Sequence, residues 1–224
     1  MSIAIPSAPG TERRRKRLGF FGPSSAEQPL ISNDASSPFA ESFRLLALNI
    51  QTLLSFDARK ALVVMSGYAK DGRSVVAANL ALALAEQHDV LLIDERRRAF
   101  AGGGSLTEIF RSGAVPTDTM IPGDLQRSIV STTHPRISIM PRLVDAAGDD
   151  VEAAIARASD AGVYTIIDTP PALTASDAFA EAQMAGNALY VVRGATTDLE
   201  AHRRVREQLE RLNVNILGIL VNER

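Results

Sequence analysis

The stretch GYAKDGRS, from Gly67 to Ser74, has the spacing of a phosphate-binding P-loop, whose pattern is G-x-x-x-x-G-K-[ST]. Every fixed position matches except the lysine, which is Arg73 here. The apolar run ALVVM ends at Met65, just before this stretch, and a segment with helical spacing follows it. A loop between a strand and a helix turns backbone N–H groups and the helix N-terminus toward an anion. The spacing and its flanks therefore predict a phosphate site with an altered central charge.

Two aspartates stand at the ends of apolar runs elsewhere in the chain. Asp94 ends VLLID, and Asp168 ends YTIID before a Thr-Pro-Pro turn. Because ligands of an open parallel sheet bind beyond the carboxyl ends of its strands, we expect both acids beside the loop. Together with the Ser74 hydroxyl they offer the oxygen ligands of a nucleotide-bound Mg²⁺. Either acid alone is equally typical of a helix cap or a turn. Asp177 is a further possible group for binding Mg²⁺ or positioning water if the protein is an active enzyme.

The elements that must position these residues are short apolar runs that alternate with segments of helical spacing. Strands are predicted at 61–65, 89–93, 137–140, 163–167, 188–192 and 215–221, and helices at 38–54, 74–87, 105–112, 149–160, 176–185 and 198–212. Residues 113–135 show no pattern and are predicted to be loop. Continuously apolar strands separated by helices indicate a parallel sheet that is covered on both faces. The predicted class is α/β, a P-loop NTPase-like parallel sheet with helices on both faces.

Composition divides the chain into two parts. Residues 1–37 are rich in Ser, Pro and Gly and carry RRRKR at 13–17, which predicts a flexible basic tail. Residues 38–224 form the single predicted domain.

The basic cluster suits anionic lipid, nucleic acid, an acidic partner or plain solvation. A net charge of −2 argues against bulk nucleic-acid binding, and the absence of cysteine excludes disulfides and Cys-based metal sites. Without a membrane-spanning run or a signal peptide, we expect a cytoplasmic protein.

Several segments resemble the bacterial tyrosine kinases of capsule and exopolysaccharide biosynthesis, which belong to the deviant-Walker group with the septum-site and partition ATPases. The resemblance covers roughly residues 38–224. VVMSGYAKDGRSVVAANLALALAEQHDVLLID resembles the family's core, ESFRLLALNIQ its subunit-contact helix, YTIIDTPPALTASDAFA its Walker B region and LGILVNER its last strand. The resemblance implies ATP or ADP with Mg²⁺. It also implies a membrane chain-length regulator as partner, a homo-oligomer, and a location at the inner face of the membrane.

The resemblance also assigns roles to particular positions of this chain. It implies nucleotide contacts from Gly67, Asp71, Gly72, Arg73 and Ser74, with Asn222 near the adenine. It implies Mg²⁺ ligands at Ser74, Asp94 and Asp168, and catalytic roles for the two aspartates if the protein is active.

The departures from the family pattern concern charge. Arg73 replaces the family's lysine, and a planar guanidinium is expected to misplace the charge that phosphoryl transfer needs. The family's Asp-x-Asp reads Asp94-Glu95-Arg96, its Pro-Gly in the loop reads Ala69-Lys70, and Ala47 replaces an arginine of the subunit-contact helix. The family's tyrosine-rich tail, which receives phosphate, has no counterpart before Arg224. The tyrosines present are Tyr68, Tyr164 and Tyr190.

These features favour a degenerate, kinase-like regulatory partner of a membrane polysaccharide co-polymerase. An active ATP-dependent protein-tyrosine kinase or ATPase, using Asp94 and Asp168, is the first alternative. A partition or positioning ATPase is the second, although its signature lysine would fall at Tyr68. A scaffold that binds no nucleotide is the third.

Overall fold

A twisted sheet forms the centre of the computed structural model, which describes residues 2–4, 30–31, 34–94, 106, 110, 129–141, 148–194 and 198–223. Its strand order is β1-β8-β7-β2-β6-β3-β5-β4. The six strands from β8 to β5 run parallel, as the sequence predicts. They are β2 (Ala61–Ser66), β3 (Val90–Asp94), β5 (Ile137–Pro141), β6 (Tyr164–Asp168), β7 (Asn187–Arg193) and β8 (Asn215–Asn222).

Short antiparallel strands close both edges of this sheet. β4 (Val130–Ser131) pairs with β5, and β1 (Ser2–Ala4) pairs with β8. β4 falls in a segment predicted to be loop, because a strand of two residues leaves no periodic pattern in the sequence. β1 falls in the segment predicted to be tail, whereas the RRRKR cluster lies outside the described residues.

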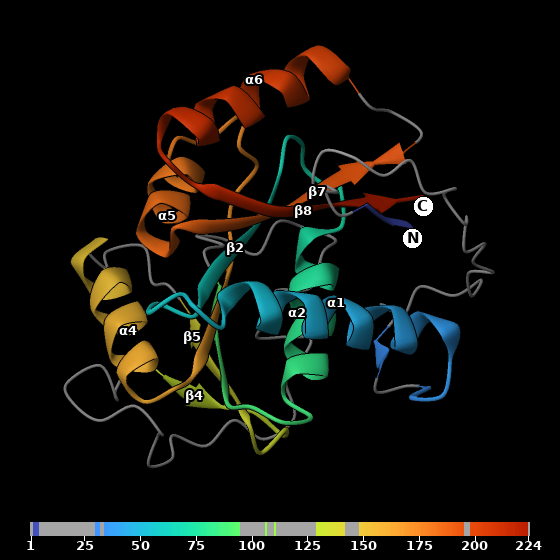
Figure 1. Cartoon of the computed structure of the whole chain (residues 1–224), viewed down its shortest axis with the longest axis vertical. Coiled ribbons are helices and arrows are strands. Elements are labelled where there is room, and N and C mark those ends of the chain that lie inside the picture. The colour runs from blue at the N-terminus through green and yellow to red at the C-terminus, as the bar shows by residue number, and fades with distance from the viewer. Residues whose placement is uncertain are drawn as a thin grey trace.

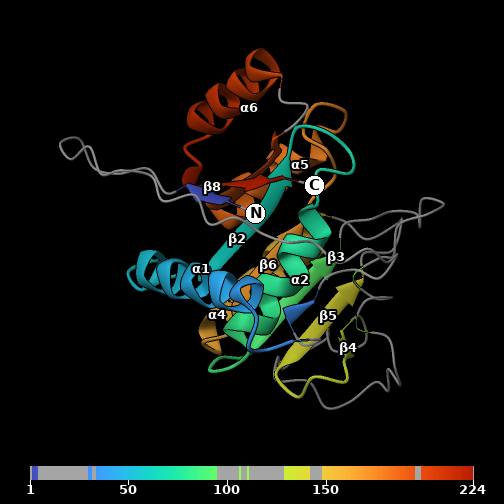
Figure 2. The same cartoon turned by 90° about the vertical axis from the view of Figure 1, so that its right-hand side faces the viewer.

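Helices cover both faces of the sheet, which confirms the predicted architecture (Figures 1 and 2). α1 (Pro38–Leu54) and α2 (Arg73–Leu84) pack on one face. α4 (Gly148–Asp160), α5 (Asp177–Ala185) and α6 (Leu199–Arg211) pack on the other. Side chains of β2 alternate between the two cores, since Leu62 and Val64 contribute to the first and Val63 and Met65 to the second. Among the described helices, none has the length and apolar character needed to cross a membrane.

The helix that carries Arg73 and Ser74 is held rigidly. α2 lies between the sheet and α1, and nearly all of its residues are buried, including Asn79. α1 begins as its sequence predicts, because Ser37 caps it by accepting a hydrogen bond from Ala40 N at 3.1 Å. Its buried stripe includes Phe43 and Ile50. The start of α2 is therefore fixed by core packing.

Of the helix predicted at 105–112, only residues 106 and 110 are described. The residues after Asp94, including Glu95 and Arg96, also lie outside the described part of the chain.

Candidate functional site

The loop between β2 and α2 is held by its own polar groups. The Ser66 hydroxyl donates to Tyr68 O at 2.8 Å, and the Asp71 carboxylate accepts from Tyr68 N at 3.0 Å. Gly72 has a φ of 98°, and Lys70 has a φ of 67° in the left-handed region. Gly72 is the N-cap of α2 and offers no side-chain cap, so the helix begins with its N–H groups directed toward the loop. A strand, a loop and a helix N-terminus thus form the cradle that the sequence predicts.

Arg73, Ser74 and Asp168 meet beneath this cradle. The Ser74 hydroxyl donates to Asp168 Oδ2 at 2.5 Å. The guanidinium of Arg73 donates from Nη1 to Ser66 Oγ at 3.1 Å, and its Nε lies 3.9 Å from Asp168 Oδ1. The side chains of Arg73 and Asp168 are only 9% and 1% exposed. The arginine at the P-loop lysine position is therefore buried and ion-paired with the acid that ends β6.

Asp94 lies next to Asp168, as expected for equivalent ends of parallel strands. The two residues are register partners on β3 and β6, and both side chains are buried. Asp177 instead occupies the first turn of α5, beyond the turn that follows β6. Asp94 and Asp168 therefore lie side by side at the carboxyl ends of β3 and β6, and Ser74 at the start of α2 reaches the same place through its hydrogen bond to Asp168.

Asn222 reaches the loop from the end of β8. Its Nδ2 donates to Asp71 O at 2.9 Å. A Cβ atom at Gly72 would lie 2.5 Å from the same nitrogen, so the Asn222 side chain would have to move to admit one, and the φ of 98° itself favours glycine. In this structure Asn222 fastens the last strand to the loop, and its contact with adenine remains an expectation.

An aromatic cluster joins the start of the loop to α6. The Tyr190 hydroxyl and His202 Nδ1 are 2.7 Å apart, and the ring of Tyr68 lies edge-on to His202 with centroids 5.9 Å apart. The Tyr68 hydroxyl also donates to Asp198 Oδ2 at 3.3 Å. Gly67 lies against this cluster, since an added Cβ would be 3.2 Å from the His202 ring. The first turn of α6 is thereby connected to the phosphate loop.

Burial and local charge set the ionisation of this cluster. Burial raises the pKa of Tyr190 far above its ordinary value, and the charge of Asp71 adds to the shift. The pKa of Asp198 is lowered chiefly by its hydrogen bond from Ala201 N, where it caps α6, and further by Tyr68. These tyrosines are therefore neutral, and Asp198 ionised, at neutral pH.

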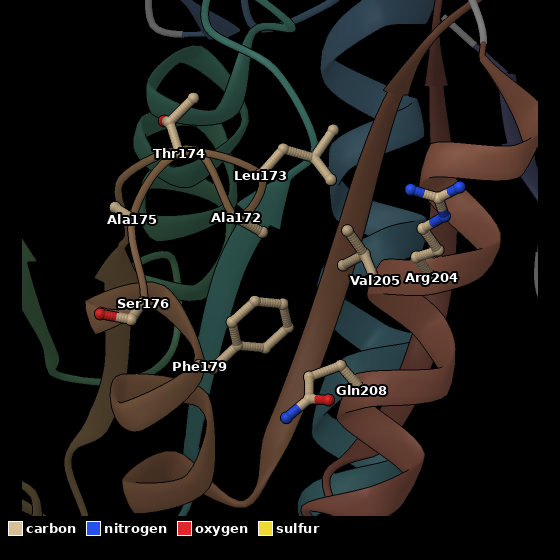
Figure 3. A pocket seen from close by; sticks show the side chains of 9 residues that line it. All are labelled: Ala172, Leu173, Thr174, Ala175, Ser176, Phe179, Arg204, Val205 and Gln208. Carbon is tan, nitrogen blue, oxygen red and sulfur yellow. The ribbon is translucent and has the colours of Figure 1, made fainter.

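An open groove of about 460 Å³ lies between the turn after β6 and α6 (Figure 3). Leu173, Phe179 and Val205 give it an apolar interior, and Arg204 and Gln208 lie along α6 at its rim. The remaining lining residues are Ala172, Thr174, Ala175 and Ser176. Backbone hydrogen bonds from Ala172 N to Ser66 O and from Leu173 N to Gly67 O join this turn to the phosphate loop.

The residues present do not fit a Mg²⁺ ion bound at Asp168. Serine and aspartate oxygens are the correct kind of ligand. However, Asp168 Oδ2 already accepts from Ser74, and Oδ1 faces the fixed cation of Arg73. A divalent cation at Asp168 would meet that guanidinium at close range in a buried site.

Sequence reasoning identified the loop and both strand-end acids but missed the groups that surround them. Asp198 stands before a predicted helix, which is typical of an N-cap. Nothing in the linear sequence, however, links it to Tyr68. His202 and Tyr190 lie on separate elements, α6 and β7, and come together beside the loop only in the folded structure.

No family model matches the chain, but it is similar to individual known proteins. It is 28% identical over 208 residues to "Tyrosine-protein kinase ptk" of Acinetobacter johnsonii, covering 87% of this chain and 28% of that protein. It is 26% identical over 207 residues to "Succinoglycan biosynthesis transport protein ExoP" of Rhizobium meliloti, covering 87% of this chain and 26% of that protein. The chain thus spans about a quarter of the length of these relatives.

Solved structures show the same fold. The kinase domain of Escherichia coli tyrosine kinase ETK superposes with a TM-score of 0.71 at 21% identity, over 93% of this chain and 84% of that one. The cell division ATPase MinD of Pyrococcus furiosus superposes with a TM-score of 0.58 at 20% identity, over 72% of this chain and 71% of that one. The P-loop NTPase-like fold and the resemblance to bacterial tyrosine kinases are both confirmed.

Proposed function

We propose that this chain, a relative of the bacterial tyrosine kinases of exopolysaccharide biosynthesis, is a nucleotide-binding regulatory component of that process with impaired phosphoryl transfer. The observation that carries the proposal is the buried ion pair of Arg73 with Asp168, at 3.9 Å. A P-loop lysine acts as a compact charge at the transferred phosphate. Here the guanidinium of Arg73 neutralises the carboxylate of Asp168 and donates a hydrogen bond to the Ser66 hydroxyl.

The consequence for catalysis follows from the role of positioning. Phosphoryl transfer depends almost entirely on where charges stand in the transition state, so a displaced cation removes most of the acceleration. Arg73 is 8% exposed and anchored by two buried partners, which opposes its extension toward a bound phosphate.

Binding of ATP or ADP is supported by the parts of the loop that remain. The left-handed Gly72, the uncapped start of α2 and the strand–loop–helix arrangement are the features that hold phosphate in this fold. Asn222 and Asp71 fix the far side of the loop through their 2.9 Å hydrogen bond. The site therefore keeps its shape after the change of its central charge.

A membrane chain-length regulator at the inner face of the membrane is the proposed partner. The family resemblance supports this proposal, and so does the similarity to a protein named for succinoglycan biosynthesis and transport, ExoP of Rhizobium meliloti. A homo-oligomer through α1 is also proposed. Ala47 is buried, and the exposed surface at α1 and the turn after it includes four large apolar side chains, Leu45, Leu48, Leu53 and Phe56, among polar ones. Whether the basic segment adds membrane contact is tested by binding to anionic vesicles with and without residues 1–37.

An active kinase remains the second candidate, because Ser74, Asp94 and Asp168 do lie together at the carboxyl ends of β3 and β6. In that case Arg73 would substitute for lysine, and the substrate would be another protein.

The test compares nucleotide binding and turnover in the wild type, Arg73→Lys and Asp168→Ala. Calorimetry measures ADP and ATP affinity, and radiolabelled ATP measures phosphate release and transfer to a tyrosine copolymer. We expect the wild type to bind ADP but to turn over ATP at least about tenfold more slowly than Arg73→Lys. Arg204→Lys, an exposed change on α6, is the matched control and should alter neither. Wild-type turnover that Asp168→Ala abolishes and Arg73→Lys does not raise would establish the active kinase instead.

A further inference from the structure

The guanidinium of Arg73 stands beside the carboxylate that would bind the nucleotide's metal ion in a related enzyme. We infer that this site binds nucleotide diphosphate without recruiting Mg²⁺, because Arg73 is a built-in cation at Asp168. The inference rests on the proposed nucleotide binding and specifies which cation neutralises the site.

The two Asp168 oxygens have different surroundings: Oδ2 is hydrogen-bonded, whereas Oδ1 is 3.9 Å from the Arg73 cation, close enough for an ion pair but too far for a hydrogen bond. Oδ2 accepts the Ser74 hydroxyl hydrogen bond, and Oδ1 is the atom that faces Arg73 Nε. The serine contact alone would not exclude a metal, since a hydroxyl can rotate away. The guanidinium cannot rotate away so easily, because its Nη1 is tied to Ser66 Oγ within the core.

Two cations, Arg73 and Mg²⁺, compete for one buried acid. Asp168 is fully buried, so it requires a positive partner. Arg73 supplies one that is covalently attached and loses no hydration when a nucleotide binds. Mg²⁺ gives up its water reluctantly, and at Asp168 it would also have to displace Arg73 from a buried contact. The additional affinity that a P-loop site gains from Mg²⁺ should therefore be absent.

Replacing Arg73 by lysine should have the opposite effect and make nucleotide binding depend on Mg²⁺. Lysine has no Nε–H group and no fork, so it cannot reproduce both the Ser66 hydrogen bond and the approach to Asp168. Arg73→Lys should release part of Asp168 for an external cation. This variant should gain a dependence on Mg²⁺ that the wild type lacks.

The experiment measures the Kd of ADP by calorimetry in excess Mg²⁺ and in excess EDTA, for the wild type, Arg73→Lys and the control Arg204→Lys. We expect Mg²⁺ to change the wild-type and control Kd by less than about threefold, and that of Arg73→Lys by about tenfold or more. Mg²⁺ alone, added without nucleotide, should not raise the wild-type melting temperature.

The possible failures are distinguishable. Wild-type binding of ADP that needs Mg²⁺ would overturn this inference and leave the proposed nucleotide binding intact. Absence of ADP binding in both conditions would overturn both.

Discussion

Removing the two members of the buried pair, singly and together, measures how strongly Arg73 neutralises Asp168. The variants are Arg73→Met, Asp168→Asn and the double variant. At 3.9 Å and an effective dielectric constant of about 20, Coulomb's law gives an attraction of about 4 kcal/mol. We expect a coupling energy of about 2–4 kcal/mol, and a loss of about 3–5 kcal/mol for Arg73→Met, because that variant leaves a buried carboxylate without its cation.

The assay is urea unfolding followed by far-UV circular dichroism, with the coupling taken from the four free energies of unfolding. Arg206 and Glu210 on α6 are the matched control, because they form a pair of similar length, 3.6 Å, with side chains 56% and 59% exposed. That cycle should give no more than about 0.5 kcal/mol and should weaken in high salt, whereas the buried coupling should persist. A coupling below about 0.5 kcal/mol for Arg73 and Asp168 would refute the claim that the guanidinium is the acid's counter-ion.

Three further predictions concern the loop and its surroundings. Gly72→Ala should cost about 2–3 kcal/mol of unfolding free energy in the same assay, because φ is 98° and the new Cβ would lie 2.5 Å from Asn222 Nδ2. The double change with Asn222→Ala should recover only the part due to the clash. Lys70→Gly should raise stability by about 0.5 kcal/mol, because Lys70 has a φ of 67°, whereas Ala69→Gly next to it should lower stability by a similar amount. The raised pKa of Tyr190 means that the folded state keeps the phenol proton at a pH where the unfolded state has lost it. The stability that the protonated phenol contributes is therefore fully present below the ordinary tyrosine pKa of about 10 and is lost as the pH rises above it. Urea unfolding from pH 8 to 11 should therefore show the wild type losing about 1 kcal/mol more than Tyr190→Phe between pH 10 and 11, and equal losses would contradict this.

The parallel sheet could be predicted because its strands are buried on both faces. Such strands read as short continuous apolar runs, and the intervening helices read by their spacing. The two edge strands could not be predicted in this way. β4 has two residues and β1 has three, and each exists only because a neighbouring strand offers it hydrogen bonds. Pairing between distant segments has no local signal.

The candidate site could be predicted in position but not in bonding. Spacing along the chain placed Asp94 and Asp168 at equivalent strand ends, and the structure makes them register partners. The direction in which Arg73 points depends on its rotamer and on the hydroxyl of Ser66, which the P-loop pattern does not specify. The contact of Asn222 with Asp71 depends likewise on how far β8 extends toward the loop.

Under the proposed function, the charge at Asp168 is the reason that a single position separates nucleotide binding from catalysis. A buried carboxylate there needs a cation, and the fold permits either an exchangeable ion or a side chain from the start of α2. An exchangeable ion arrives with the nucleotide and can follow the charge that develops on the transferred phosphate. A guanidinium anchored to Ser66 is present before the nucleotide binds and remains where it is. The same scaffold, loop and acids can therefore support ligand binding while the charge required for transfer stays committed to the protein.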